Sequence, residues 1–188
     1  MCRFQWQGIC LMDRKRRQIL NAALLGPVSL ALPWLNANAS VRERNLSFYH
    51  THTGEKLSLV YHDGLDYLPD SLENVNSYLQ DFRTGESHSI DRNLLDQLYV
   101  LQQSVNSSGV FEVISGYRSP RTNAKLRNKS NGVARKSLHM QGRAIDVRLT
   151  DVSSGNLRKA ALAMRAGGVG YYKKSNFLHL DTGRFRTW

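Results

Sequence analysis

The sequence predicts an α+β fold: one small single domain in which helices pack on a central antiparallel sheet. Short segments that alternate apolar and polar residues predict strands, and longer segments with apolar residues every three or four positions predict amphipathic helices. Strands and helices do not alternate regularly, which favours α+β over a parallel α/β arrangement. Residues 40–188 have about the length of one domain, and no internal repeat or low-complexity linker divides them.

The first two strands are predicted on either side of a turn at Thr53-Gly54, because apolar and polar residues alternate before and after it. This pattern is typical of a β-hairpin. His50, His52 and His62 fall in the hairpin. We expect them to be solvent-facing strand residues rather than metal ligands, since no ligand spacing repeats around them.

Two amphipathic helices are predicted next, over residues 68–83 with Asp70 or Ser71 as N-cap, and over residues 89–105. A short strand at 110–115 follows, then a basic connection at 116–137 with a short helix from Pro120 to Arg127. Residues 143–149 predict a strand. Residues 153–167 predict a helix that ends at Gly167, and residues 167–183 predict two strands joined through 173–176.

The first 39 residues have the pattern of an export signal. A charged segment at 13–17 precedes an apolar stretch at 19–35, and Ala37-Asn38-Ala39 matches a small-x-small cleavage site. Arg16-Arg17 favours the twin-arginine route over an ordinary secretion signal. Met12 is the expected true start. The stretch is too short and too broken to be a stable membrane anchor, so we expect a periplasmic protein.

Removal of this signal changes the composition. Cys2 and Cys10 precede the cleavage site, so the mature chain has no cysteine and no disulfide. Residues 1–39 hold five Lys+Arg and one Asp, which leaves 21 − 14 = +7 for the rest. A basic exported protein suits anionic partners such as cell-wall polymer. No run of Lys and Arg interleaved with aromatics is present, so we do not expect a nucleic-acid partner.

Three potential metal ligands occur at predicted strands or strand edges: His139, Asp146 and His179. A carboxylate among apolar strand residues costs free energy unless a positive group compensates it. Two imidazoles and one carboxylate would leave a Zn²⁺ ion with an open fourth position, which is the catalytic coordination pattern. The alternative is structural: each histidine is a satisfied core residue, and Asp146 pairs with Arg143 or Arg148.

The same segments resemble a known family. "SLHMQGRAID" resembles the Ser-x-His-x-x-Gly-x-Ala-x-Asp motif of the zinc D-alanyl-D-alanine peptidases, and "FLHLD" resembles their last metal-binding strand. "SGYRSPRTN" resembles the arginine-bearing segment beside their substrate, and the group most similar is that of murein endopeptidase K. The resemblance covers roughly Asn45 to Trp188 and implies an α+β domain with a central antiparallel sheet.

The resemblance also implies roles for single residues. His139, Asp146 and His179 would be the Zn²⁺ ligands. Arg118 would contact the substrate or the oxyanion, and Ser137 would lie beside the substrate. The implied activity is zinc-dependent hydrolysis of peptide stems of peptidoglycan at a crosslink, either diaminopimelate–diaminopimelate or D-Ala–diaminopimelate, by an enzyme expected to be a monomer.

One position departs from the family pattern. Many relatives carry Glu three residues before the last ligand as general base, and here that position is Asn176, which cannot take a proton. Asp181 lies two residues after His179, on the same face of the strand. It is expected either to act as the base or to orient the ligand as a hydrogen-bond acceptor. The departure keeps open the alternative of a catalytically weak or inactive zinc-containing wall-binding or regulatory module. The basic charge leaves a further alternative, a protein that binds anions by charge alone.

Overall fold

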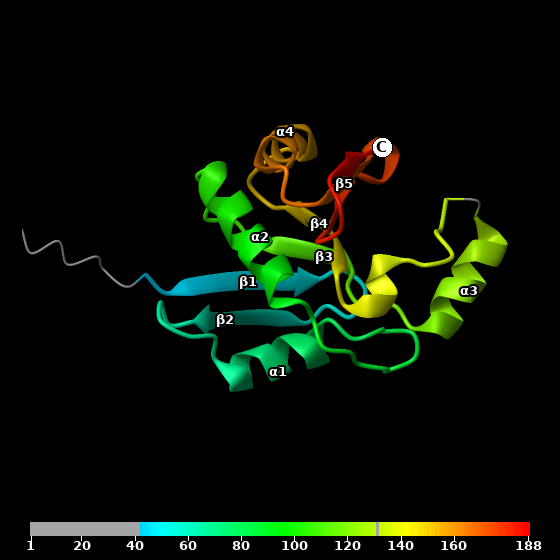
Figure 1. The fold of residues 1–188 in the computed structure, drawn as a ribbon, viewed down its shortest axis with the longest axis horizontal. Helices are drawn as coiled ribbons and strands as arrows, with labels where there is room; N and C mark the ends of the chain where they lie inside the picture. Colours follow the sequence, from blue (N-terminus) through cyan, green and yellow to red (C-terminus); the bar gives the residue numbers. More distant parts are fainter. Residues whose placement is uncertain (1–41, 131) are drawn as a thin grey trace, which may run out of the picture. The chain divides into compact units, whose positions relative to one another are not determined.

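A computed structural model describes residues 42–130 and 132–188, and the predicted signal at 1–39 lies outside the described residues. Four α-helices and a seven-stranded sheet make up the described part (Figure 1), which confirms the predicted α+β class. The strands are β1 Arg44–His50, β2 Lys56–His62, β3 Phe111–Ser115, β4 Ala144–Leu149, β5 Gly168–Tyr172, β6 Phe177–Asp181 and β7 Arg186–Thr187. The helices are α1 Pro69–Tyr78, α2 Arg92–Ser104, α3 Pro120–Lys129 and α4 Ser154–Met164, with short 3-10 turns η1 Leu138–Gln141 and η2 Lys173–Ser175.

The strands follow the order β2-β1-β3-β4-β6-β5-β7. The predicted hairpin of β1 and β2 is present, with Gly54 at a φ of 76° in its turn. The central pairs β3–β4, β4–β6 and β6–β5 are antiparallel, as predicted. Two pairs are parallel: β1–β3, whose strands are joined through α1 and α2, and β5–β7. A long crossover permits the first of these.

One face of the sheet carries the hydrophobic core. Alternate residues point to opposite faces of a strand, and the residues of β4 and β6 that flank the predicted ligands are fully buried on the core face. They are Ile145, Val147, Leu178 and Leu180. Three helices pack here, α1 against β2, α2 against β1 and α4, and α4 against β4, β5 and β6. Asp146 and His179 therefore face the other side of the sheet.

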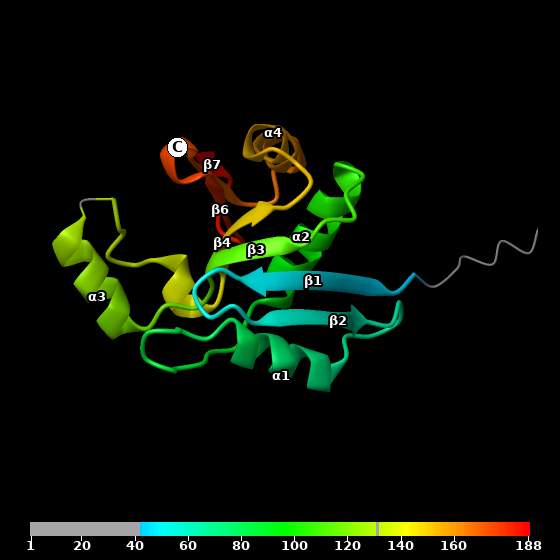
Figure 2. The same ribbon diagram turned by 180° about the vertical axis from the view of Figure 1, so that it is seen from behind.

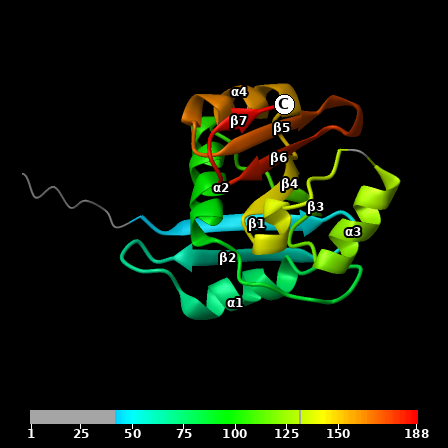
Figure 3. The same ribbon diagram turned by 45° about the vertical axis from the view of Figure 1, so that its right-hand side comes forward.

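Helix α3 is arranged differently from the other three. In all three ribbon views it projects past the end of β1, away from α4 (Figures 2 and 3). Its N-cap is Ser119, whose hydroxyl accepts the backbone N–H of Thr122, and Pro120 occupies the first turn. The short helix predicted in the basic connection is thus confirmed, extended to Lys129.

A half-buried polar cluster ties α2 to the hairpin. Asp96 accepts hydrogen bonds from Arg44 at 2.7 Å, Tyr61 at 2.9 Å and Tyr67 at 2.6 Å. Burial alone raises the pKa of Asp96. The hydrogen bonds from Tyr67, Arg44 and Tyr61 outweigh burial, so its net pKa lies below the ordinary value.

Several sequence expectations were wrong. The first helix begins at Pro69 after Leu68, because proline is well suited to the first turn, and not after Asp70 or Ser71. The last helix ends at Met164 with Arg165 in the left-handed conformation, ahead of Gly167.

No helix among residues 42–130 and 132–188 has the length and apolar content to cross a membrane.

The hairpin histidines were also predicted wrongly in part. His50 and His62 are buried, whereas His52 is exposed but lies in the turn between the strands. The His50 ring packs edge-on against Phe82, and its Nδ1 accepts the backbone N–H groups of His52 and Thr53. These are structural contacts, so a neutral imidazole is satisfied there without a metal.

Candidate functional site

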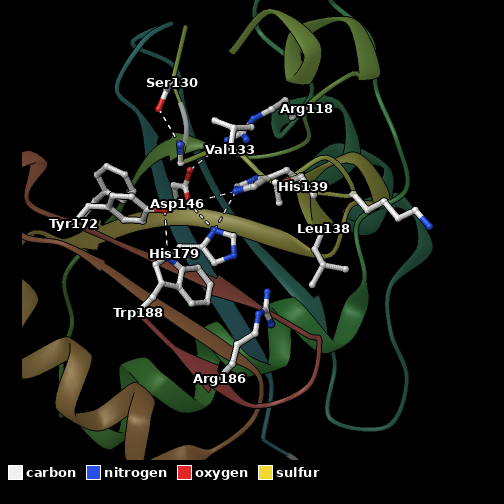
Figure 4. Close-up of a pocket in the computed structure, with 15 residues that line it drawn as sticks. Arg118, Ser130, Val133, Leu138, His139, Asp146, Tyr172, His179, Arg186 and Trp188 are labelled. Atoms are coloured by element: carbon white, nitrogen blue, oxygen red, sulfur yellow. Dashed lines mark hydrogen bonds and ion pairs between the residues drawn. The ribbon is translucent and has the colours of Figure 1, made fainter. Parts of the chain in front are cut away.

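Three segments distant in the sequence bring the predicted ligands together (Figure 4). Asp146 on β4 and His179 on β6 lie directly opposite each other in the antiparallel ladder. His139 comes from η1, and the residue that caps η1, Gly142, has a φ of 64°. A side chain at Gly142 would place its Cβ 2.1 Å from the carbonyl oxygen of Ser89, so glycine permits the close approach that brings η1 to the sheet.

The ligand atoms form a compact triangle. His139 Nε2 lies 3.1 Å from His179 Nδ1 and 3.3 Å from Asp146 Oδ1, and His179 Nδ1 lies 2.9 Å from Asp146 Oδ1. A tetrahedral Zn²⁺ with bonds of about 2.0 Å separates its ligand atoms by about 3.3 Å. Among the described residues, this is the group of His, Cys, Asp and Glu side chains that fits one ion.

The positions of the protons strengthen the fit to a cation. His139 Nδ1 lies 2.8 Å from the carbonyl oxygen of Gly116, which only accepts, so Nδ1 donates and Nε2 carries a lone pair. His179 Nε2 lies 2.9 Å from Asp181 Oδ2 and donates to it, which leaves a lone pair on Nδ1. Two lone pairs and one carboxylate oxygen then face a common point. This arrangement needs a cation at that point, or a proton in its place.

The pKa shifts at the site follow from the same contacts. Burial lowers the pKa of His139, which favours the neutral imidazole that binds metals. Burial also lowers the pKa of His179, but hydrogen bonds to Asp146 and Asp181 outweigh it and raise the pKa to about 8. Burial would raise the pKa of Asp146, yet His139 and His179 bring it well below its usual range. The carboxylate is therefore ionised and available as a ligand.

Asp181 lies beside His179, fully buried. Its Oδ1 accepts the backbone N–H groups of Gly168 at 3.1 Å and Gly183 at 2.8 Å. Arg186 donates to both oxygens, at 3.0 and 2.7 Å, and His179 Nε2 donates to Oδ2. Burial raises the pKa of Asp181, but these hydrogen bonds outweigh it and hold the pKa well below its usual range. Both oxygens are occupied by donors, on the side of His179 that faces away from Asp146.

Arg118 and Ser137 also lie at the site. The Nη2 atom of Arg118 is 3.5 Å from Asp146 Oδ2 and 3.4 Å from Ser115 Oγ, while its buried Nε has no hydrogen-bond partner in the described residues. Asp146 therefore pairs with Arg118. The two alternatives from the sequence are wrong, because Arg143 pairs with Asp91 and Arg148 with Glu112.

A cavity of about 410 Å³ opens beside the ligand group. Arg118, Ser137 and the three ligands line it, together with Tyr172, Phe177, Arg186 and Trp188. The ring centroids of Trp188 and His179 are 5.2 Å apart. The Nε1 atom of Trp188 donates to the Tyr172 hydroxyl at 3.2 Å (Figure 4). The ligand group is thus accessible from the cavity.

Sequence reasoning gave no role to Trp188 or Arg186, but a signal for both was present. Gly168 and Gly170 occupy the same face of β5. A Cβ at Gly170 would lie 2.6 Å from the Trp188 ring, and one at Gly168 would lie 2.4 Å from Arg186. Glycines at alternate positions of a strand mark the close approach of another group.

Asn176, at the position where many relatives carry the general base, does not point its side chain into the cavity of the ligand group. Asn176 follows η2 in the left-handed conformation, with a φ of 52°. Its Oδ1 accepts a hydrogen bond from the Ser154 hydroxyl at 2.8 Å, and it lines a separate cavity with Glu112 and Arg148. Asn176 does not line the cavity that holds the ligand group.

Comparison with known proteins gives consistent matches. Residues 38–188 match the model of a family described as Peptidoglycan L,D-endopeptidase MepK. The protein of that name from Escherichia coli K12 is 43% identical over 178 residues, which cover 94% of this chain and 98% of the relative. The probable peptidoglycan L,D-endopeptidase MepK of Haemophilus influenzae is 37% identical over 183 residues, 94% of this chain and 97% of the relative. The chain therefore belongs to the MepK family of peptidoglycan L,D-endopeptidases.

Proposed function

We propose that this chain is a zinc-dependent endopeptidase that hydrolyses peptide crosslinks of peptidoglycan. The observation that carries the proposal is the convergence of two imidazole lone pairs and one carboxylate oxygen within 3.3 Å of one another, at the wall of an open cavity. Membership of a family named for peptidoglycan hydrolysis supports the substrate class. Three protein ligands with one open position are the pattern of catalytic rather than structural zinc.

The name that the relatives carry supports one of the two candidate scissile bonds. An L,D-endopeptidase cleaves between an L centre and a D centre. A diaminopimelate–diaminopimelate crosslink has this stereochemistry, whereas both centres of a D-Ala–diaminopimelate link are D. We therefore assign the first bond to this chain as its substrate.

Each side chain at the site has a proposed task. His139, Asp146 and His179 hold the metal, which supplies Lewis-acid activation of a peptide carbonyl and of water when bound. Arg118 points its guanidinium toward the ligand group and stabilises negative charge on the substrate, either a carboxylate or the developing oxyanion. Ser137 lines the cavity, which supports its proposed task of contacting the peptide.

For Asp181 we propose the orienting role rather than that of general base. Its two oxygens already accept from Gly168, Gly183, Arg186 and His179, and it has no exposed surface. A carboxylate in this position fixes the tautomer and the ring orientation of a metal-binding histidine.

The proposed setting is the periplasm. The pattern of residues 1–39 supports export, by the twin-arginine route in our proposal, with cleavage after Ala39. Substrate and enzyme would then share one compartment. We propose that the exported domain acts as a monomer.

Digestion of purified peptidoglycan, with products identified by mass, tests the proposal. The intact protein should release crosslink-cleaved muropeptides, and a chelator should abolish the release until Zn²⁺ is restored. Full activity in metal-free protein would refute a metal mechanism. Products cut only at D-Ala–diaminopimelate links would refute the assigned bond.

A second candidate function is a zinc-containing wall-binding module with little or no activity. It is favoured by one observation: among the described residues that line the cavity, Asp146 has the single side-chain carboxylate, so a separate Asp or Glu base is lacking. Stoichiometric zinc without cleavage of any crosslinked muropeptide would support it. Binding to peptidoglycan that survives loss of the metal ligands and weakens with salt would instead indicate an anion-binding protein that uses charge alone.

A further inference from the structure

Residues 120–130 and 132–136, which we term the basic arm, are α3 and the described part of the loop that follows it. They lie in a stretch from 113 to 145 that holds eight Lys and Arg and no Asp or Glu. All six basic residues of the arm are exposed, and none forms an ion pair within the described part of the chain. They are Arg121, Lys125, Arg127, Lys129, Arg135 and Lys136. A surface of one sign without compensating acids attracts anionic partners.

The base of the arm is fixed to the body of the domain. The backbone N–H of Ser119 donates to buried Asp81 at 2.9 Å, and the Tyr117 N–H donates to the carbonyl of Leu79. Within the arm, the side chain of Asn123 donates to the carbonyl of Ala134, which ties the helix to its loop. The cationic side chains are therefore presented from an ordered support, which lowers the entropic cost of binding.

The arm is continuous with the cavity of the ligand group. Ser130, Val133, Ala134 and Lys136 of the arm line this cavity, as do Tyr172 and Trp188. Helix α3 extends the surface outward by about 15 Å, the length of ten helical residues. A polymer whose crosslink enters the cavity would therefore lie along α3.

We propose that the basic arm binds free carboxylates of peptide stems next to the crosslink in the cavity. This inference rests on the proposed function and adds a second contact region for the same polymer. Stem peptides carry α-carboxylates that are not used in crosslinks, and guanidinium and ammonium groups are their natural partners. The arm thus selects for polymeric, uncapped peptidoglycan, whereas the cavity alone recognises the bond to be cleaved.

The test compares two triple variants of the full chain with equal loss of charge. The arm variant is Arg121→Gln/Lys125→Gln/Lys129→Gln, at exposed positions that do not line the cavity. The control variant is Arg42→Gln/Arg92→Gln/Lys159→Gln, at exposed positions outside the arm. Hydrolysis is measured on whole sacculi, on sacculi whose free carboxylates are capped as amides, and on a soluble crosslinked muropeptide dimer.

The arm variant should lose about tenfold in kcat/KM on whole sacculi at low salt, through KM, since three modest ion pairs are removed. The control variant should have the same kcat/KM on whole sacculi as the unmodified protein. Carboxylate capping or about 1 M salt should reduce the unmodified protein to the level of the arm variant. Activity on the soluble dimer should be equal for all three proteins.

Equal loss in the arm and control variants would overturn the proposal, because net charge would then be the cause. So would an arm effect that survives carboxylate capping, or an arm effect on vesicles of phosphatidylglycerol with none on sacculi, which would indicate a lipid surface. Absence of hydrolysis of both sacculi and dimer by the unmodified protein would refute the proposed function instead. Hydrolysis of both, without an arm effect, would refute only this inference.

Discussion

Replacement of Asp181 by Asn tests how the metal site is organised. Asp181 Oδ1 accepts three donors, from Gly168, Gly183 and Arg186, while Oδ2 accepts from His179 and Arg186. An asparagine keeps one side-chain oxygen, and this oxygen would take the place of Oδ1 and accept the hydrogen bonds of its three donors. Its NH₂ group would then face His179 Nε2, and two donors cannot satisfy each other.

The imidazole has one way to relieve this conflict. If His179 moves its proton from Nε2 to Nδ1, Nε2 can accept from the new amide, but Nδ1 loses the lone pair that faces Asp146 and His139. The ligand set then has two donors instead of three. Loss of an outer hydrogen-bond partner costs about 10- to 100-fold in metal affinity, or about 1.4–2.7 kcal/mol. We expect the loss of zinc affinity in Asp181→Asn to fall in this range.

Competition with a chelator of known affinity measures this loss directly, on folded protein and without reference to turnover. Asp151→Asn is the matched control, since Asp151 is exposed, accepts from Ser107 and Ser108, and does not line the cavity that holds the ligand group. The control should retain the affinity of the unmodified protein. Circular dichroism at the working temperature establishes that both variants are folded.

The two expected roles of Asp181 give opposite results. As an orienting acceptor it governs zinc affinity, and activity should return in part when zinc is added in excess. As a general base it governs kcat, with zinc affinity intact and no rescue. Unchanged zinc affinity in a folded Asp181→Asn protein would refute the tautomer argument.

Further predictions concern other parts of the molecule. His139→Ala should bind less than a stoichiometric amount of zinc by elemental analysis and release no muropeptides; turnover at the unmodified rate would contradict the ligand assignment. Asp96, whose pKa lies below its ordinary value, contributes stability above the unfolded pKa of about 3.9, and that stability is lost as the pH falls through the lower folded pKa. Asp96→Asn should therefore cost about 1–3 kcal/mol at pH 7 and much less near pH 2 in urea unfolding, and an equal cost at both pH values would disprove this. Gly170→Ala should cost about 1–3 kcal/mol and alter Trp188 fluorescence, because the new Cβ meets that ring. Gly155→Ala, in open space on α4, should be neutral or stabilising by up to about 1 kcal/mol, and equal melting temperatures for the two alanine variants would refute the contact.

Much of the fold could be predicted because hydrophobic periodicity is a local property. Apolar alternation defined the hairpin and β4, and the Asp91 side chain caps α2 where the apolar stripe begins. The three proposed ligands could be found in the sequence because Asp146 and His179 lie in strands among apolar neighbours, where an uncompensated polar group is costly. His139 lies in the short turn just before β4. Neither result required knowledge of which strands pair.

The rest depended on tertiary contacts that the sequence does not display. His50 and His62 were expected in solvent, yet they are buried. Phe82 packs on His50 and Tyr67 packs on His62, and backbone N–H groups two or three residues further along the chain donate to the Nδ1 atom of each ring. The contact of Trp188 with His179 depends on β7, a strand of two residues that is too short to give a periodic signal. The direction in which the Asn176 side chain points depends on the left-handed backbone conformation of that residue.

Asp146 and His179 lie directly opposite each other in the β4–β6 ladder, and this determines which insertions and deletions the family can tolerate. The 32 residues between them can lengthen or shorten in exposed loops without moving either ligand, because pairing of the strands alone sets their spacing. A single deletion inside β6 is different. It would turn the imidazole of His179 toward the packed helices and bring a leucine to the proposed metal site. This site therefore depends on the register of the strand as much as on the identity of any side chain.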